Sequence, residues 1–172
     1  MKNFLILILI SLCLFSCKDR NEDPNVLPEA TQFGKNTAGA LVDGKVWVAS
    51  TDFINPPEGT FCEKINNTYS IHIFLKHQFN NTYLTLNSKI DNLVIGQEYI
   101  LPQSSNTDVD SGIYSSSNFI YMTSAPNYTG KIKITGLDLQ NQIVSGTFEF
   151  KAIDNNGNTI NITDGRFDKK FD

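Results

Sequence analysis

The sequence has little of what most catalytic and metal sites are built from. Its 172 residues include only two histidines, His72 and His77, together with three cysteines and one tryptophan. It contains no glycine-rich phosphate loop, no Gly-x-Ser-x-Gly nucleophile elbow and no His-Glu-x-x-His metal motif. We therefore predict no catalytic residues, no metal ligands and no cofactor, and we expect that the chain is not an enzyme.

Basic residues are also in short supply. The chain has 14 Lys and Arg against 18 Asp and Glu, which gives a net charge of −4. Proteins that bind nucleic acid rely on clustered Lys and Arg to neutralise phosphates. The acidic balance therefore argues against a nucleic-acid partner.

The longest apolar run stands at the start of the chain. Residues 4–10 are all apolar and follow Lys2, and after residue 17 the sequence becomes polar at once. A membrane-spanning helix needs roughly 20 mostly apolar residues, so a shorter run with a charged start is typical of a cleaved secretory signal. We predict a signal peptide over residues 1–16.

The end of this run resembles the lipobox of bacterial lipoproteins. Leu14 is the aliphatic residue at −3, Ser16 the small residue at −1, and Cys17 follows directly. Its thiolate can take a diacylglyceryl group, and two or three acyl chains suffice for stable attachment because each buried methylene contributes about 0.8 kcal/mol. We predict lipidation of Cys17, which makes a membrane the first partner. An ordinary secretory peptide with incidental cysteines is the alternative.

Residues 17–35 are polar, contain two prolines and show no apolar periodicity, which favours a flexible linker. Its acidic residues Asp19, Glu22 and Asp23 resemble the export tag of some Bacteroidetes lipoproteins, although a plain solvated linker explains them equally well. We expect a lipid-anchored protein of the outer membrane or cell surface, with a periplasm-facing position as the alternative.

Cysteine use excludes an intrachain disulfide in the mature protein. Cys13 leaves with the signal peptide and Cys17 carries lipid, so Cys62 stands alone. A single cysteine is most often a small buried hydrophobic residue. A reactive or intermolecular thiol is the sharper alternative.

Residues 36–172 alternate between apolar and polar side chains, with turn signals between the runs, which is typical of short antiparallel strands. Asp43-Gly44 is a dipeptide favoured in two-residue hairpins. We predict strands over residues 40–42, 45–49, 69–76, 82–90, 98–101, 118–123, 131–135 and 144–152, and a last strand that starts at residue 160 and includes residues 164–166. The fold class is all-β, a single antiparallel β-sandwich or small barrel of about 8–9 strands in one domain.

Two polar clusters invite a functional interpretation. Asn106, Asp108 and Asp110 alternate like ligands of a calcium loop, but serines occupy the positions of its glycine and closing glutamate, so a polar surface loop is favoured. Gly165 lies inside the last predicted strand, where glycine indicates a bulge. We expect its neighbour Arg166 to pair with a carboxylate rather than with a substrate.

Histidines and aromatic residues give weaker hypotheses. His72 and His77 are five residues apart and would point to opposite faces of a strand, so structural roles are favoured over a metal pair. An aromatic platform for a glycan or hydrophobic ligand is one hypothesis, but aromatic residues on strands mostly join the core or pair across strands. The residues in question are Trp47, Tyr69, Tyr83, Tyr99, Tyr114, Tyr121 and Tyr128.

Two stretches resemble a known family. They are residues 36–48, which read NTAGALVDGKVWV, and the C-terminal pair of residues 144–150, VSGTFEF, and 160–168, INITDGRFD. Together they are similar to the Bacteroidetes lipoproteins grouped as domain of unknown function 6252. The resemblance implies a surface or periplasmic lipoprotein and brings no established activity.

We therefore expect a membrane-anchored lipoprotein of the bacterial cell envelope, a non-enzymatic binding or interaction module. Its ligand could be a protein, a glycan or a small molecule. A lipocalin-like carrier, in which inward side chains line a cavity, is the alternative.

Overall fold

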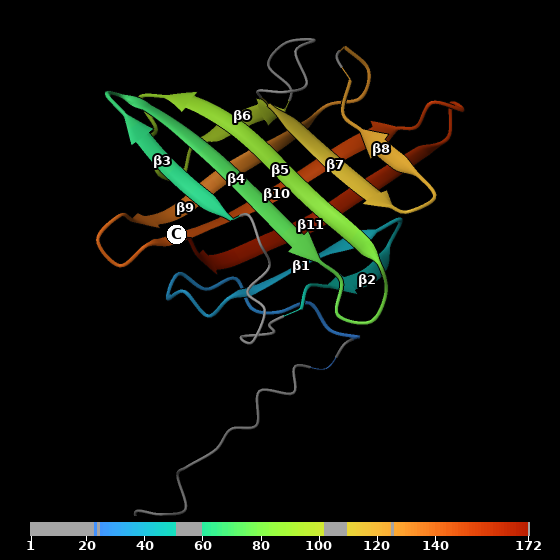
Figure 1. Cartoon of the computed structure of the whole chain (residues 1–172), viewed down its shortest axis with the longest axis horizontal. Helices are drawn as coiled ribbons and strands as arrows, with labels where there is room; N and C mark the ends of the chain where they lie inside the picture. The colour runs from blue at the N-terminus through green and yellow to red at the C-terminus, as the bar shows by residue number, and fades with distance from the viewer. Residues whose placement is uncertain (1–22, 24, 51–59, 102–109, 125, 172) are drawn as a thin grey trace, which may run out of the picture.

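The computed structural model describes residues 23, 25–50, 60–101, 110–124 and 126–171. This part of the chain folds into antiparallel β-strands, which confirms the predicted all-β class (Figure 1). It contains no helix with the length and apolar character needed to span a membrane. The predicted signal peptide and Cys17 lie outside the described residues.

The described residues form eleven strands. They are β1 (Thr37–Val42), β2 (Lys45–Val48), β3 (Phe61–Ile65), β4 (Thr68–Lys76), β5 (Thr82–Asp91), β6 (Glu98–Leu101), β7 (Ser111–Ser116), β8 (Ile120–Met122), β9 (Gly130–Asp138), β10 (Ile143–Ile153) and β11 (Thr159–Lys170).

The strands form one curled sheet, a half-barrel that folds over its own core. The continuous path runs β2-β1-β11-β10-β8-β7-β5-β4-β3. β10 pairs with β9 along Ile143 to Phe150 and meets β8 only at Ile153, so β9 and β6 form a side branch. Figure 1 shows β3, β4, β5 and β7 in front of β9, β10 and β11. We call β3, β4, β5, β7 and β8 the front layer. The back layer consists of β1, β2, β6, β9, β10 and β11.

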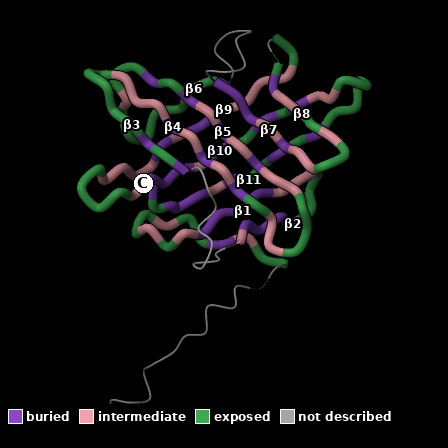
Figure 2. Tube along the Cα trace, viewed as in Figure 1, coloured by how far each residue is buried: buried purple, intermediate pink, exposed green. Residues whose placement is uncertain are grey.

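Period-two alternation explains how the core forms. Along β4 and β5 every second side chain points inward, and Ile73, Leu75, Leu84 and Leu86 are fully buried. Together with inward side chains of the back layer, among them Phe148 of β10, they form one continuous cluster. Figure 2 shows buried residues along the strands of both layers. Hydrophobic burial on both inner faces therefore stabilises the fold.

Nine of the eleven strands match predicted ones, and β3 and β7 were missed. Asp43 and Gly44 both have positive φ, as the hairpin between β1 and β2 requires. The predicted bulge in the last strand is confirmed as well. The register between β10 and β11 shifts between Phe148 and Phe150, and Asp164 has a φ of 51°.

The chain before β1 lies across the outer face of the back layer, and we call residues 27–36 the strap. A Cβ on Gly39 of β1 would come within 2.9 Å of Pro28, and one on Gly136 of β9 within 3.3 Å of Gln32. Glycines on the sheet thus make room for the strap. The domain therefore holds residues that precede the predicted boundary at residue 36.

Candidate functional site

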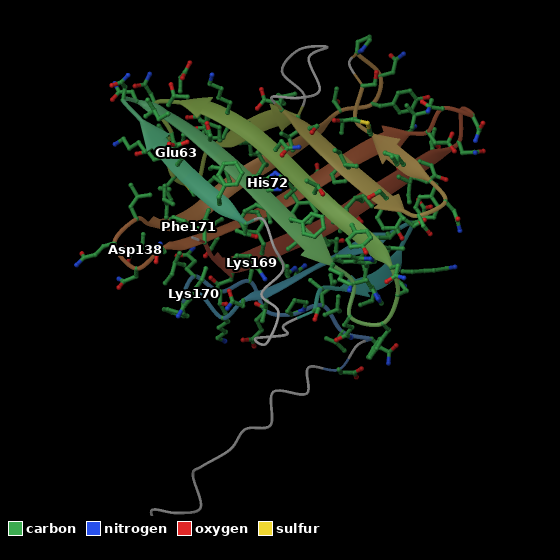
Figure 3. All side chains as sticks on the ribbon, in the orientation of Figure 1. Glu63, His72, Asp138, Lys169, Lys170 and Phe171 are labelled. Carbon is green, nitrogen blue, oxygen red and sulfur yellow. The ribbon has the colours of Figure 1, made fainter. Side chains whose placement is uncertain are left out.

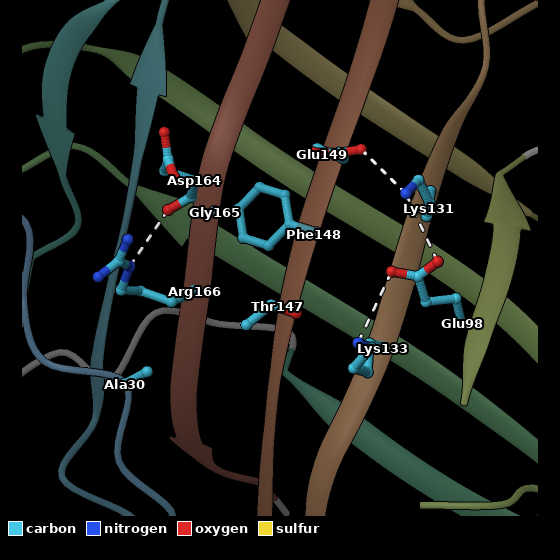
Figure 4. A pocket seen from close by; sticks show the side chains of 10 residues that line it. All are labelled: Ala30, Glu98, Lys131, Lys133, Thr147, Phe148, Glu149, Asp164, Gly165 and Arg166. Atoms are coloured by element: carbon cyan, nitrogen blue, oxygen red, sulfur yellow. Dashed lines mark hydrogen bonds and ion pairs between the residues drawn. The ribbon is translucent and has the colours of Figure 1, made fainter. Parts of the chain in front are cut away.

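A hollow of about 350 Å³ lies on the outer face of the back layer, over β6, β9, β10 and β11 (Figure 4). We call it the groove. Three cations and three acids dominate its lining, and the strap contributes one small side chain. The lining residues are Ala30, Glu98, Lys131, Lys133, Thr147, Phe148, Glu149, Asp164, Gly165 and Arg166.

Ion pairs link four of these side chains. The Nζ of Lys131 lies 3.4 Å from Glu98 and 3.3 Å from Glu149, and the Nζ of Lys133 lies 3.6 Å from Glu98. The hydrogen bond to Glu149 and the charge of Glu98 raise the pKa of Lys131 above its usual value. These side chains are between 37% and 53% exposed, so water and an incoming ligand can reach them. Exposed pairs of this kind contribute little to stability.

Arg166 is the third cation of the groove. The prediction that it pairs with a carboxylate is wrong, because no carboxylate of the described residues forms an ion pair with it. Its Nε donates to the carbonyl oxygen of Asp164 at 3.1 Å, and its Nη1 donates to the carbonyl oxygen of Pro28 at 3.5 Å. Figure 4 shows the carboxylate of Asp164 directed away from the guanidinium. The guanidinium is therefore held by backbone carbonyls, and its charge has no carboxylate partner in this part of the chain.

The bulge in β11 sets the position of Arg166. Because the bulge adds one residue to the strand, the side chains that follow Asp164 are rephased relative to β10. A Cβ on Gly165 would come within 2.5 Å of the carbonyl oxygen of Phe148, so only glycine fits there without rearrangement. Arg166 then stands directly opposite Thr147 on the outer face.

A single carboxylate fastens the strap beside the groove. Asp168 accepts hydrogen bonds from the Thr31 and Ser145 hydroxyls at 2.6 and 2.8 Å, and from the backbone N–H groups of Phe33, Gly34 and Lys35 at 3.0, 2.8 and 3.2 Å. Burial raises the pKa of Asp168, but these hydrogen bonds lower it by more, so the pKa lies below its usual value. Its partners on the strap are more than 130 positions away in the sequence, so no local sequence pattern predicts these hydrogen bonds.

The two histidines occupy separate structural positions, as predicted. The ring of His72 on β4 stacks on Phe61 with centroids 5.3 Å apart (Figure 3). The Nδ1 of His77 accepts the N–H groups of Phe79 and Asn80 at 3.0 and 3.2 Å. Burial lowers the pKa of His77, which agrees with a neutral ring that accepts hydrogen bonds.

Of the calcium-like triad, Asn106 and Asp108 lie outside the described residues. The carboxylate of Asp110 accepts the backbone N–H of Lys89 at 2.7 Å, and burial raises its pKa. Within the described part of the chain, no three His, Cys, Asp or Glu side chains gather as metal ligands would.

Cys62 is confirmed as a small buried residue. It is 7% exposed on β3, and burial raises the pKa of its thiol to about 11. A thiol with so high a pKa is a poor nucleophile at neutral pH, because the thiolate is the reactive form.

Most residues of the supposed aromatic platform belong to the core or to local pairs, as expected. Trp47 and Tyr114 are buried, while Tyr69, Tyr99 and Tyr121 pack against the core. Tyr83 instead stacks on Phe74 with centroids 5.5 Å apart, and the Nζ of Lys151 lies 5.7 Å from the ring of Tyr128.

Comparison with known proteins identifies the family and no individual relative. No curated protein and no solved structure matches the chain significantly. The family model described as "Domain of unknown function (DUF6252)" matches residues 63–169, a span that covers most of the half-barrel and nearly all of the groove. The chain therefore belongs to the DUF6252 family.

Proposed function

We propose that this protein is a lipid-anchored, non-enzymatic binding module of the bacterial cell envelope and that the groove is its ligand site. The observation that carries the proposal is the hollow on the outer face of the back layer, lined by six charged side chains. Concave sites with a few convergent polar groups are where proteins usually bind ligands.

The anchor is supported by the leader sequence that ends at Cys17. Attachment to the outer membrane or cell surface is proposed on the acidic residues that follow, with a periplasm-facing position as the alternative. The lipocalin-like carrier receives less support. Inward side chains such as Ile73, Leu86 and Ile134 are fully buried and fill the interior.

The anchor is tested by metabolic labelling of the full-length chain with a fatty acid, followed by detergent-phase partitioning. We expect Cys17→Ser to lose both the lipid label and the detergent-phase protein. Cys13→Ser is the matched control, because Cys13 would leave with the signal peptide, and it should behave like the wild type. Lipid labelling of the Cys17→Ser protein would contradict the proposal.

The ligand site is tested by a binding screen of glycans, lipids and envelope proteins against the full-length chain. Thr147→Trp would fill the centre of the groove, whereas Asn161→Trp places the same ring on an exposed position of β11 outside it. We expect only Thr147→Trp to abolish binding. A ligand that both variants retain would place the binding site elsewhere.

A further inference from the structure

We propose that the groove recognises the carboxylate of an acidic sugar, with Arg166 as its anchor. This inference rests on the proposed function, because it names the ligand class of the same groove. Two carboxylates, Glu98 and Glu149, are paired with the two lysines, whereas among the described residues Arg166 bonds to backbone carbonyls only.

The guanidinium of Arg166 is oriented and has donors to spare. A guanidinium carries five N–H donors, and the bonds to Asp164 and Pro28 use one on Nε and one on Nη1. Its planar fork matches a carboxylate with two parallel hydrogen bonds. Because the carbonyls hold the side chain in place, little rotamer freedom is lost when a ligand binds.

The sheet register places a second cation and a hydroxyl in line with Arg166. Arg166 pairs directly with Thr147 of β10, and Thr147 pairs directly with Lys133 of β9. Figure 4 shows these three side chains in a row across the groove. Since neighbouring strands lie about 4.8 Å apart, Arg166 and Lys133 flank the Thr147 hydroxyl from backbones about 10 Å apart.

The remaining charges favour a singly charged group. Glu98, Glu149 and Asp164 also line the groove and would repel a phosphate dianion more strongly than a carboxylate. Glu98 is shared between Lys131 and Lys133. A ligand carboxylate can therefore bind Lys133 while Glu98 stays paired with Lys131.

The lining of the groove also indicates what kind of molecule carries the carboxylate. Its hydrophobic lining consists of Ala30 and Phe148, and Phe148 is only 4% exposed. Peptides are usually recognised through pockets for side chains or through an open strand edge. A floor of six charged side chains and the Thr147 hydroxyl instead suits a ligand rich in hydroxyls, which favours a uronic acid over an acidic peptide.

The test is calorimetric titration of the full-length chain in detergent with trigalacturonate and with galactotriose, its neutral counterpart. We expect trigalacturonate to bind at least about tenfold more tightly, because a hydrogen bond to a charged group contributes roughly 1.5–3 kcal/mol. Arg166→Gln should weaken trigalacturonate binding by at least about tenfold. Lys151→Gln removes an equal charge from β10 outside the groove and should leave binding unchanged.

Lys133→Gln gives a second variant that leaves the contact between Arg166 and the strap intact, and it should also weaken binding. Equal affinity of the wild type and Arg166→Gln for trigalacturonate would overturn the inference. So would Arg166-dependent binding of an acidic tripeptide in place of the sugar.

Failure of the inference can be told apart from failure of the proposed function. Suppose that the screen yields a ligand whose binding is blocked by Thr147→Trp but unaffected by Arg166→Gln. The groove would then stand as a binding site, and carboxylate recognition by Arg166 would be refuted. If Thr147→Trp blocks no ligand, the groove itself is wrong and both proposals fall.

Discussion

Asp168 is the residue on which the strap's contacts with the sheet converge. Three successive N–H groups of the strap, from Phe33 to Lys35, donate to its carboxylate in the manner of an anion-binding nest. The chain supplies its own anion to this nest. Two hydroxyls complete the set, so a buried charge is satisfied by five donors.

We expect Asp168→Asn to lower the free energy of unfolding by about 3 kcal/mol, because the amide loses the charge and turns donors toward donors. Since the folded pKa of Asp168 is depressed, its stabilisation is present above the usual carboxyl pKa of 3.8 and is lost as the pH falls through the lower folded value. Urea denaturation at several pH values should show the difference from wild type shrinking below about pH 4. Asp164→Asn is the control, because asparagine tolerates the positive φ at that exposed position.

Lys169 follows Asp168 on β11 and, by the alternation of the strand, points the opposite way, toward the core (Figure 3). It is 2% exposed, and its Nζ donates to the carbonyl of Asn36 at 3.3 Å. Burial lowers its pKa from 10.5 to about 8. The charged form is therefore disfavoured in the folded state.

Lys169→Met should raise the free energy of unfolding at neutral pH, by up to about 3 kcal/mol from the pKa difference. Because the folded pKa is depressed, the penalty in the wild type is full below about pH 8 and disappears as the pH rises toward 10.5. The advantage of the variant should vanish over the same range in denaturation curves. Lys170→Met, an exposed neighbour, should show no such trend, and a flat difference for Lys169→Met would contradict the buried charge.

Among the elements, strands with strong alternation were predictable and two others were not. β3 contributes one buried side chain, Cys62, and lies at the edge of the sheet, so its sequence shows no apolar face. The inward positions of β7 include Gly112, where a Cβ would meet the ring of Phe150 at 2.7 Å. Because a glycine takes an inward position and the ring of Phe150 fills the space there, β7 does not show the apolar-polar alternation of a strand.

The groove was predictable only in part for a similar reason. The glycine signal correctly indicated the bulge that positions Arg166. The pairing of β6 with β9, however, brings Glu98 to Lys131 from 33 positions away, and the strap arrives from still farther. Long-range register of this kind is set by packing of the whole sheet, which local patterns do not record.

The bulge should be intolerant of a side chain. Gly165→Ala places a methyl group 2.5 Å from the carbonyl oxygen and 2.6 Å from the ring of Phe148, so we expect a loss of about 2 kcal/mol or more. Gly157→Ala is the contrasting control, since its φ of 86° is unfavourable for alanine but its Cβ would meet open space, whereas Gly165 is crowded without a positive φ. It should lose only about 1 kcal/mol in urea denaturation. A loss at Gly165 no larger than the loss at Gly157 would mean that the sheet relaxes around the added methyl group and that crowding at the bulge costs little.

At the scale of the whole molecule, the strap joins the region that leads to Cys17 to the wall of the groove. Pro28 holds Arg166, Ala30 lines the groove, and Thr31 binds Asp168. The strap is therefore part of the wall of the proposed binding site. A chain that begins at Asn36 would lose this wall and leave Asp168 with Ser145 as its remaining donor.

A double-mutant cycle can test this coupling. In the chain that begins at Asp23, Asp168→Ala should be strongly destabilising, because it removes the acceptor of five donors. In the chain that begins at Asn36, the same change should be nearly neutral, since loss of the strap exposes the carboxylate on the outer face, where water replaces the missing donors. We expect an interaction energy of about 2 kcal/mol or more between the truncation and the substitution, measured by urea denaturation. Additive effects would mean that the strap is held by its other contacts and that Asp168 does not fasten it.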